Sequence, residues 1–229
     1  MDRDQSWQII AEQRLSLADL LDNLSDADWE TPSLCAGWRV RDVAAHVAMA
    51  PQVPNLAAMI ADGTRARGSF HRLNHDVAVR HADSRPGEQI VAELRRHAYS
   101  RRLPVVTSYR NILFDILVHG QDIAIPLHRR HPMPPEAATA GATRVWAMGW
   151  PFWARHRLRG LELVATDTGW TAGHGAAIRG PIDALLLLLT GRTAAALPQL
   201  SGSGVTRLPA PHTRTGRRGP DSAPGGSHR

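Results

Sequence analysis

The stretch FDILVHGQDIAIP, residues 114–126, indicates a mostly helical protein with a polar site inside a bundle. Its apolar residues recur at helical spacing, and Pro126 stops the helix. Asp115, His119 and Asp122 follow one another at intervals of four and three residues, so a helix presents them on one face. A bundle interior should be apolar, and this polar stripe therefore predicts a functional site.

A second distinctive stretch, GWRVRDVAAH at residues 37–46, reads as the start of another helix and ends on His46. Two imidazoles and a carboxylate on facing helices form a three-ligand pocket for zinc or a similar divalent ion, with one coordination position open. From spacing alone two other interpretations remain. His46 would then be a hydrogen-bonded core histidine, and Asp115 with His119 an ordinary pair on a helix surface.

Other polar residues near this stripe have weaker assignments. We expect Asp122 to orient an imidazole by a hydrogen bond; a fourth ligand, a general base, or a helix cap or bridge to an arginine are the alternatives. Arg110 and Arg41 lie near the proposed ligands in sequence, and either could hold a carboxylate of a thiol or substrate, although surface arginines are the default. Cys35 is expected to be a buried small side chain rather than a nucleophile.

Most remaining aromatic and imidazole side chains are expected to have ordinary roles. Trp29 and Trp38 should pack in the bundle core. His174, between two glycines, could face a ligand. Solvated histidines are expected at His71, His75, His81 and His97.

Residue patterns predict helices first and a short sheet later. The expected helices are 4–24, one from about Val40, 55–61, 70–82, one begun by Ser84 as N-cap, one from Thr107 or Ser108 to about Ile125, 136–148 with an extension towards Trp153, and one opened by Gly180-Pro181 and closed by Gly191. The expected strands are 161–165, 170–172 and 176–178.

The periodicity changes near Arg159, which indicates a second module. The predicted fold class is α+β, mostly helical: an up-and-down four-helix bundle followed by a small mixed α/β domain. We place the bundle at residues 1–127, the second domain with its leading helix at 134–208, and a disordered tail at 209–229.

Composition limits the function classes. The net charge is +6, but all 27 basic residues are arginines, a bias typical of a GC-rich genome, and they are scattered; a nucleic-acid partner is therefore not favoured. A single cysteine precludes an internal disulfide. The N-terminus lacks signal-peptide features, and the longest apolar run, 182–189, is too short to cross a bilayer. We expect a cytoplasmic protein with no membrane partner.

Three stretches together resemble the mycothiol-dependent maleylpyruvate isomerase family. Residues 29–48 (WETPSLCAGWRVRDVAAHVA) resemble its N-terminal signature, and 114–127 its second metal-binding helix. Residues 161–175 with 178–192 resemble its small C-terminal domain, which is similar in shape to sterol-carrier folds. The resemblance implies a DinB-like four-helix bundle at the N-terminus.

The resemblance also implies chemistry. The family binds a divalent metal, usually taken as zinc, through one His and an acidic-x-x-x-His pair, which here are His46, Asp115 and His119. The characterised pattern has Glu at the acidic position, so Asp115 shortens that ligand by one methylene and puts the isomerase reaction itself in question. Mycothiol, an actinobacterial low-molecular-weight thiol, is the implied cosubstrate.

We therefore predict an enzyme that activates a small thiol as a metal-bound thiolate, for isomerisation of an electrophile or for transfer to it. A non-catalytic module that binds metal or thiol is the main alternative. A nucleic-acid-associated protein is a weaker one, prompted by the charge.

Overall fold

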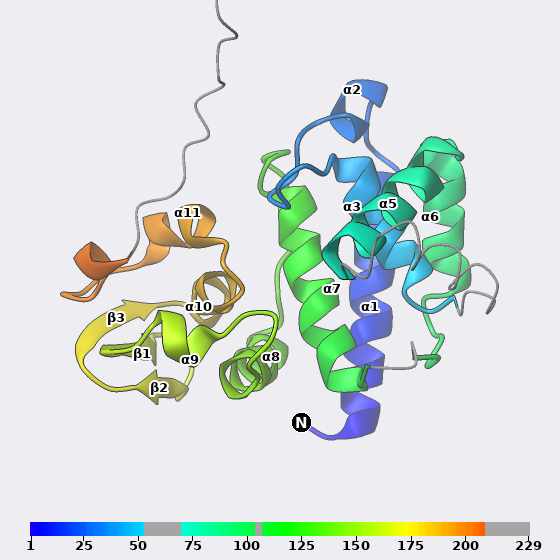
Figure 1. Cartoon of the computed structure of the whole chain (residues 1–229). Coiled ribbons are helices and arrows are strands. Elements are labelled where there is room, and N and C mark those ends of the chain that lie inside the picture. The colour runs from blue at the N-terminus through cyan, green and yellow to red at the C-terminus, as the bar shows by residue number, and fades with distance from the viewer. Residues whose placement is uncertain (53–69, 104–106, 209–229) are drawn as a thin grey trace, which may run out of the picture.

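The structure is a computed structural model that describes residues 1–52, 70–103 and 107–208 (Figure 1). The helix expected at 55–61 and the tail expected at 209–229 lie outside the described residues. The helices of the N-terminal half are α1 (Arg3–Leu21), α2 (Asp26–Trp29), α3 (Val40–Met49), α5 (Phe70–Asp83), α6 (Gly87–Arg96) and α7 (Tyr109–Ala124).

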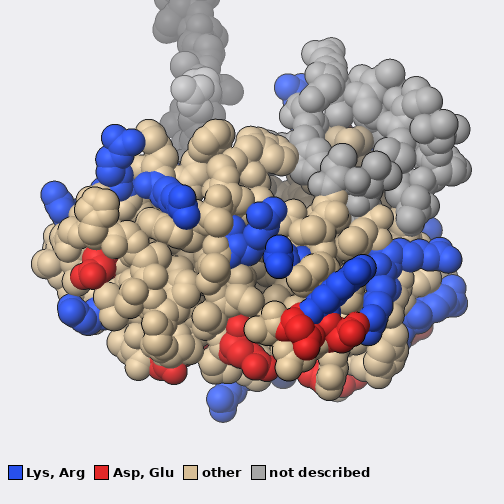
Figure 2. All heavy atoms as spheres, turned by 90° about the horizontal axis from the view of Figure 1, so that it is seen from below, with Lys and Arg blue, Asp and Glu red and all other residues tan. Residues whose placement is uncertain are grey.

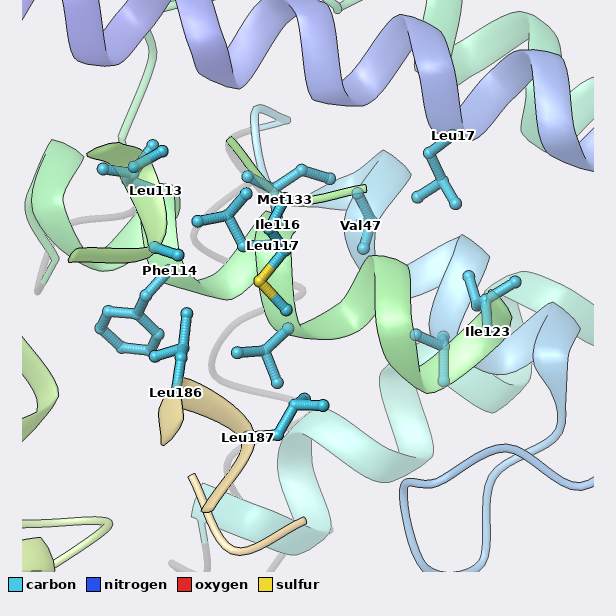
Figure 3. Close-up of a cluster of buried hydrophobic side chains, with 14 of the residues drawn as sticks. Leu17, Val47, Leu113, Phe114, Ile116, Leu117, Ile123, Met133, Leu186 and Leu187 are labelled. Atoms are coloured by element: carbon cyan, nitrogen blue, oxygen red, sulfur yellow. The ribbon is translucent and has the colours of Figure 1, made fainter. Parts of the chain in front are cut away.

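Four of these helices form the predicted bundle. α1 packs against α6 and α7, and α3 packs against the same two helices, which closes a four-membered ring (Figure 1). α5 lies against α3. The bundle interior is apolar, as at Leu17 of α1 and Val47 of α3, both buried (Figure 3). This packing holds α3 and α7 face to face.

The C-terminal half begins with α8 (Pro135–Ala147), which packs on α7 and therefore joins this half to the bundle. After α9 (Ala154–Arg157) come β1 (Leu161–Ala165), β2 (Thr171–Gly173) and β3 (Ala176–Gly180). The sheet order is β2-β1-β3, with β1 antiparallel to β2 and parallel to β3. Along β1 alternate side chains are buried, as expected for a strand with one covered face.

α10 (Ile182–Leu189) supplies most of the C-terminal core. Every residue of this helix except Asp183 is buried, and it packs on α8 and against β1. Leu186 and Leu187 reach the same hydrophobic cluster as Phe114 of α7 (Figure 3). The chain then continues through α11 (Thr193–Ala196) and the short 3-10 helices η1 (Leu197–Gln199) and η2 (Val205–Arg207).

The predicted α+β class, the bundle and the three strands are confirmed, whereas three helix boundaries were wrong. The first helix, expected to reach Leu24, ends at Leu21. Ser84 is not an N-cap: its hydroxyl donates to the carbonyl of His81, and Pro86 precedes the first turn of α6. The helix expected to extend towards Trp153 ends at Ala147, because Met148 has an extended backbone. The domain boundaries proposed above stay predictions.

No helix among the described residues is both long and apolar enough to span a membrane.

Candidate metal centre

His46 of α3 and the pair Asp115 and His119 of α7 meet where these helices face each other. The Nε2 atom of His119 is 3.4 Å from Oδ1 of Asp115, and Nε2 of His46 is 3.9 Å from Oδ2 of the same carboxylate. The two imidazole rings stand edge to face with centroids 5.0 Å apart. One ligand atom from each residue lies within 4.8 Å of the other two, so these atoms could hold a metal ion.

The other nitrogen of His119 faces a buried carboxylate. Nδ1 is 2.9 Å from Oδ2 of Asp122, whose side chain is fully buried. When Nδ1–H donates to this carboxylate, the lone pair of Nε2 is left on the side of His46 and Asp115. Asp122 therefore touches His119 in the way expected of a residue that orients an imidazole.

Arg192 also contacts Asp122, and sequence reasoning missed this residue. Its Nε donates to Oδ1 of Asp122 at 2.9 Å and its Nη2 to Oδ2 at 2.6 Å, a bidentate contact. Gly191 has a φ of 89°, and this left-handed turn ends α10 and directs Arg192 back to the bundle. The two residues are 70 positions apart, so no local spacing could have indicated the pair.

Cys35 and Trp38 are only partly buried, and both contact the candidate site in addition to the core. Cys35 is half-buried; its thiol donates to Oδ2 of Asp122 at 3.0 Å and its Sγ lies 3.8 Å from Nδ1 of His119. Trp38 packs against the core but also contacts both imidazoles, with ring centroids 5.3 Å from His46 and 6.5 Å from His119. Trp29, in contrast, is buried in the core as predicted.

A cavity of about 530 Å³ opens onto the three candidate ligands. One part of its wall is polar and includes the ligands, Cys35 and Arg192. Another part is apolar, and it is shared between α7 and a segment of the C-terminal half. The apolar residues of that part are Phe114, Val118, Pro151 and Phe152. The space is of the size that small-molecule sites commonly have.

The arginines proposed from sequence lie away from this cavity. Arg41 donates to Glu30 at 2.7 Å and to the carbonyls of Ala82 and Arg85. Arg110 lies over the ring of Tyr109, 5.4 Å from its centroid. Neither side chain lines the cavity, where the arginines among the described residues are Arg72 and Arg192.

The other histidines divide into separate environments. His75 lines the cavity and lies 3.1 Å from Asp76. His81 is not simply solvated, because its Nε2 is 2.7 Å from Oε2 of Glu93 and its side chain is 12% exposed. His174 lines a different hollow, beside Trp146. The side chain of His71 lies outside the described residues.

The electrostatics favour a cation among the three ligands. Burial and the neighbouring His119 lower the pKa of His46 to about 4, which leaves it neutral at pH 7. Burial acts against the charged form of His119, but Asp115 and Asp122 outweigh it and raise its pKa well above 6.5. Burial likewise opposes ionisation of Asp115, yet the two imidazoles lower its pKa. The metal-free site thus holds a proton on His119 that a bound cation would displace.

Two imidazole nitrogens and one carboxylate oxygen are a ligand set suited to zinc, so these residues fit the expected metal. A second group, Cys35, His119 and Asp122, is also close enough to share an ion. However, the guanidinium of Arg192 already lies against Asp122 and within 3.4 Å of Cys35 Sγ. Its positive charge disfavours a cation in that second group.

Comparison with known proteins agrees with this architecture. Residues 10–104 match the family model described as Mycothiol maleylpyruvate isomerase N-terminal domain. The predicted resemblance to this family is confirmed. The matched segment includes His46 and ends before Asp115 and His119. None of the curated proteins compared with the chain matches it.

Solved structures extend the likeness to most of the chain. A crystal structure of the mycothiol-dependent maleylpyruvate isomerase has a TM-score of 0.57 and 13% identity, and covers 89% of this chain and 93% of its own. A histidine-to-alanine mutant of the isomerase gives a TM-score of 0.51 and 12% identity over the same shares. At such identities the likeness establishes the shared fold.

Proposed function

We propose that this protein is a metal-dependent enzyme that activates mycothiol or a related low-molecular-weight thiol for reaction with a small electrophile. The convergence of His46, Asp115 and His119 on one cavity carries the proposal. The family match supports it, since that family is named for mycothiol. The single free cysteine fits a reducing compartment, and we place the protein in the cytoplasm.

In this proposal His46, Asp115 and His119 hold a divalent cation, with zinc as the expected metal. A bound zinc ion would lower the pKa of a thiol at its open position, so that thiolate is present at neutral pH. Asp122 holds the Nδ1–H of His119 and thereby fixes the ring and its tautomer. Arg192 in turn fixes both oxygens of Asp122.

The thiolate would then react in one of two ways. Addition to a cis alkene, rotation about the resulting single bond and elimination of the thiol give isomerisation. Displacement of a leaving group forms an S–C bond and gives transfer. Asp115, shorter than the Glu expected from the family pattern, keeps transfer open as the alternative to isomerisation.

The direct test is conversion of mycothiol with a panel of electrophiles by the zinc-loaded protein. We expect turnover by the wild type and its loss in His119→Ala, which should also lose bound metal by elemental analysis while keeping its helical circular dichroism. Stoichiometric metal in purified His119→Ala would contradict the ligand assignment. Metal and thiol binding without conversion of any electrophile would instead favour a non-catalytic binding module.

A nucleic-acid partner has less support. On the face shown in Figure 2 the arginines are dispersed, and several lie against acidic side chains. Arg39, for example, contacts Glu30, Asp42 and Asp83. Such neutralised arginines contribute little to binding of phosphates.

A further inference from the structure

We propose that the electrophile accepted by this cavity has an apolar, aromatic body rather than a small anionic one. This inference rests on the proposed function and adds the class of the second substrate. Two observations carry it: the aromatic wall of the cavity, and the contacts within the protein that already engage Arg192 and Thr190.

The aromatic wall is assembled from both halves of the molecule. Phe114 comes from α7, whereas Pro151 and Phe152 come from the segment between α8 and α9. The rings of Phe114 and Phe152 meet edge to face, with centroids 5.7 Å apart at an angle of 76°. Trp38 lines the same cavity beside the ligands. A planar apolar group in this space would therefore meet ring faces and edges.

The polar groups contributed by the C-terminal half are already paired. Arg192 donates to both oxygens of Asp122 and, through Nη1, to the carbonyl of Thr190. The hydroxyl of Thr190 donates to the carbonyl of Leu186 at 2.9 Å. A substrate carboxylate could take the two N–H groups of Arg192 that face Asp122 only by breaking this buried ion pair, which is unfavourable.

Among the described residues that line the cavity, Arg72 is the other arginine, and it is exposed. Water and salt weaken the attraction of an exposed cation for an anionic ligand. The enclosed surface that discriminates between ligands is therefore the aromatic wall. The cavity should therefore select an electrophile by its apolar part more strongly than by its charge.

The test compares two thioethers of mycothiol, S-benzyl and S-carboxymethyl. They are the products that form when the thiolate displaces halide from a benzyl halide or a haloacetate: an S–C bond forms, the C–halogen bond breaks, halide leaves with the bonding pair, and the thiol proton passes to solvent. Isothermal titration of the zinc-loaded protein gives both dissociation constants without requiring turnover. We expect the S-benzyl thioether to bind at least about tenfold more tightly.

Phe152→Ala should remove most of that preference, while the binding of the S-carboxymethyl thioether stays within about twofold. Trp153→Ala is the matched control, because Trp153 is the neighbouring aromatic residue, 56% exposed, and does not line the cavity. It should leave both constants unchanged. Circular dichroism checks that each variant is folded.

The outcomes separate the two proposals. Equal binding of both thioethers, tighter binding of the S-carboxymethyl form, or an unchanged preference in Phe152→Ala overturns the aromatic substrate class and leaves the proposed function standing. Preferential binding of the S-benzyl form without turnover of any halide supports the inference and contradicts the enzymatic function. Failure of the wild type to bind either thioether overturns the inference, and the turnover assay described above then decides the proposed function separately.

Discussion

Trp38 is the residue that both candidate imidazole ligands share as a packing surface. Its ring is nearly parallel to that of His119, at 25°, and tilted by 54° against that of His46. His119 is also oriented by Asp122. Among the described residues, His46 is oriented by its ring contacts and by Asp115 at 3.9 Å. The indole therefore has its largest effect on His46.

Trp38→Leu should lower zinc affinity by about tenfold or more, because His46 would lose the surface that holds its ring in place. Competition with a chromophoric chelator measures the affinity, and the cobalt-substituted protein reports ligand geometry through its visible spectrum. Trp29→Leu is the control, since Trp29 is buried in the bundle away from the ligands. Equal affinities and spectra for wild type and Trp38→Leu would contradict this role.

His131 should make the free energy of unfolding depend on pH. It is 4% exposed, its Nε2 has no hydrogen-bond partner among the described residues, and burial lowers its pKa below the ordinary 6.5. The unfolded chain takes up a proton near pH 6.5 while the folded protein resists it. The free energy of unfolding should therefore fall as the pH drops below about 6.5.

Urea unfolding at several pH values between 7.5 and 5 tests this prediction. His131→Leu should flatten the dependence relative to the wild type, whereas the same change at the exposed His156 should not. The quantity that counts is the difference between variant and wild type, because contributions common to both cancel. Identical slopes for wild type and His131→Leu would contradict the prediction.

At the scale of elements, Arg14 of α1 connects that helix to the end of α6 by hydrogen bonds. Its buried guanidinium donates to the carbonyls of His97, Ala98 and Ser100 at 3.4, 3.1 and 3.0 Å. These carbonyls follow the last turn of α6, where no helical donor remains for them. Burial lowers the pKa of Arg14 to about 10, so it stays charged at neutral pH.

Arg14→Met should reduce the free energy of unfolding by about 2–4 kcal/mol, because it removes a buried cation that bonds three carbonyls and leaves the buried carbonyl of Ala98 without this donor. Arg95→Met is the matched control. Arg95 contacts Asp19 and Asp22 on the surface, with its side chain 41% exposed, so its replacement should lower the free energy of unfolding much less. Chemical denaturation measures both values, and similar losses for the two variants would contradict the capping role.

At the scale of the whole molecule, Arg192 and Asp122 connect the C-terminal half to the helix that carries two proposed ligands. Arg192→Met should destabilise the protein by about 3–5 kcal/mol, because it leaves a buried carboxylate without its cation. Adding Asp122→Asn should recover part of this loss. A double-mutant cycle of unfolding free energies should give a coupling above about 1 kcal/mol; additivity within 0.5 kcal/mol would show that the pair is not coupled.

Much of the fold could be predicted because its signals are local. The spacing of apolar residues in α7 and the alternation in β1 depend on helix and strand geometry alone. Boundaries were less predictable: Ser84 has the chemistry of an N-cap, but its hydroxyl pairs backwards with the carbonyl of His81. Which neighbouring backbone group a serine hydroxyl bonds depends on the conformation of the folded backbone, so the sequence alone does not decide it.

The positions of some candidate-site residues could be predicted from the sequence, whereas those of others could not. Asp115, His119 and Asp122 share a helical face by their spacing, and the structure brings His46 to that face. Arg41 and Arg110 are close to the proposed ligands in sequence but lie away from the cavity, because their long side chains contact other partners. The ligand roles themselves stay predictions until metal binding is measured.

The sequence by itself determined the class of fold, the shared face of α7 that carries Asp115, His119 and Asp122, and the position of the small sheet. These follow from periodicities of a few residues. Only the tertiary structure decided that Cys35 and Arg192 meet at Asp122 and that Phe152 closes the cavity against Phe114. Such contacts join residues tens to more than a hundred positions apart, and they depend on how α8 and α10 pack against the bundle, which no local pattern encodes.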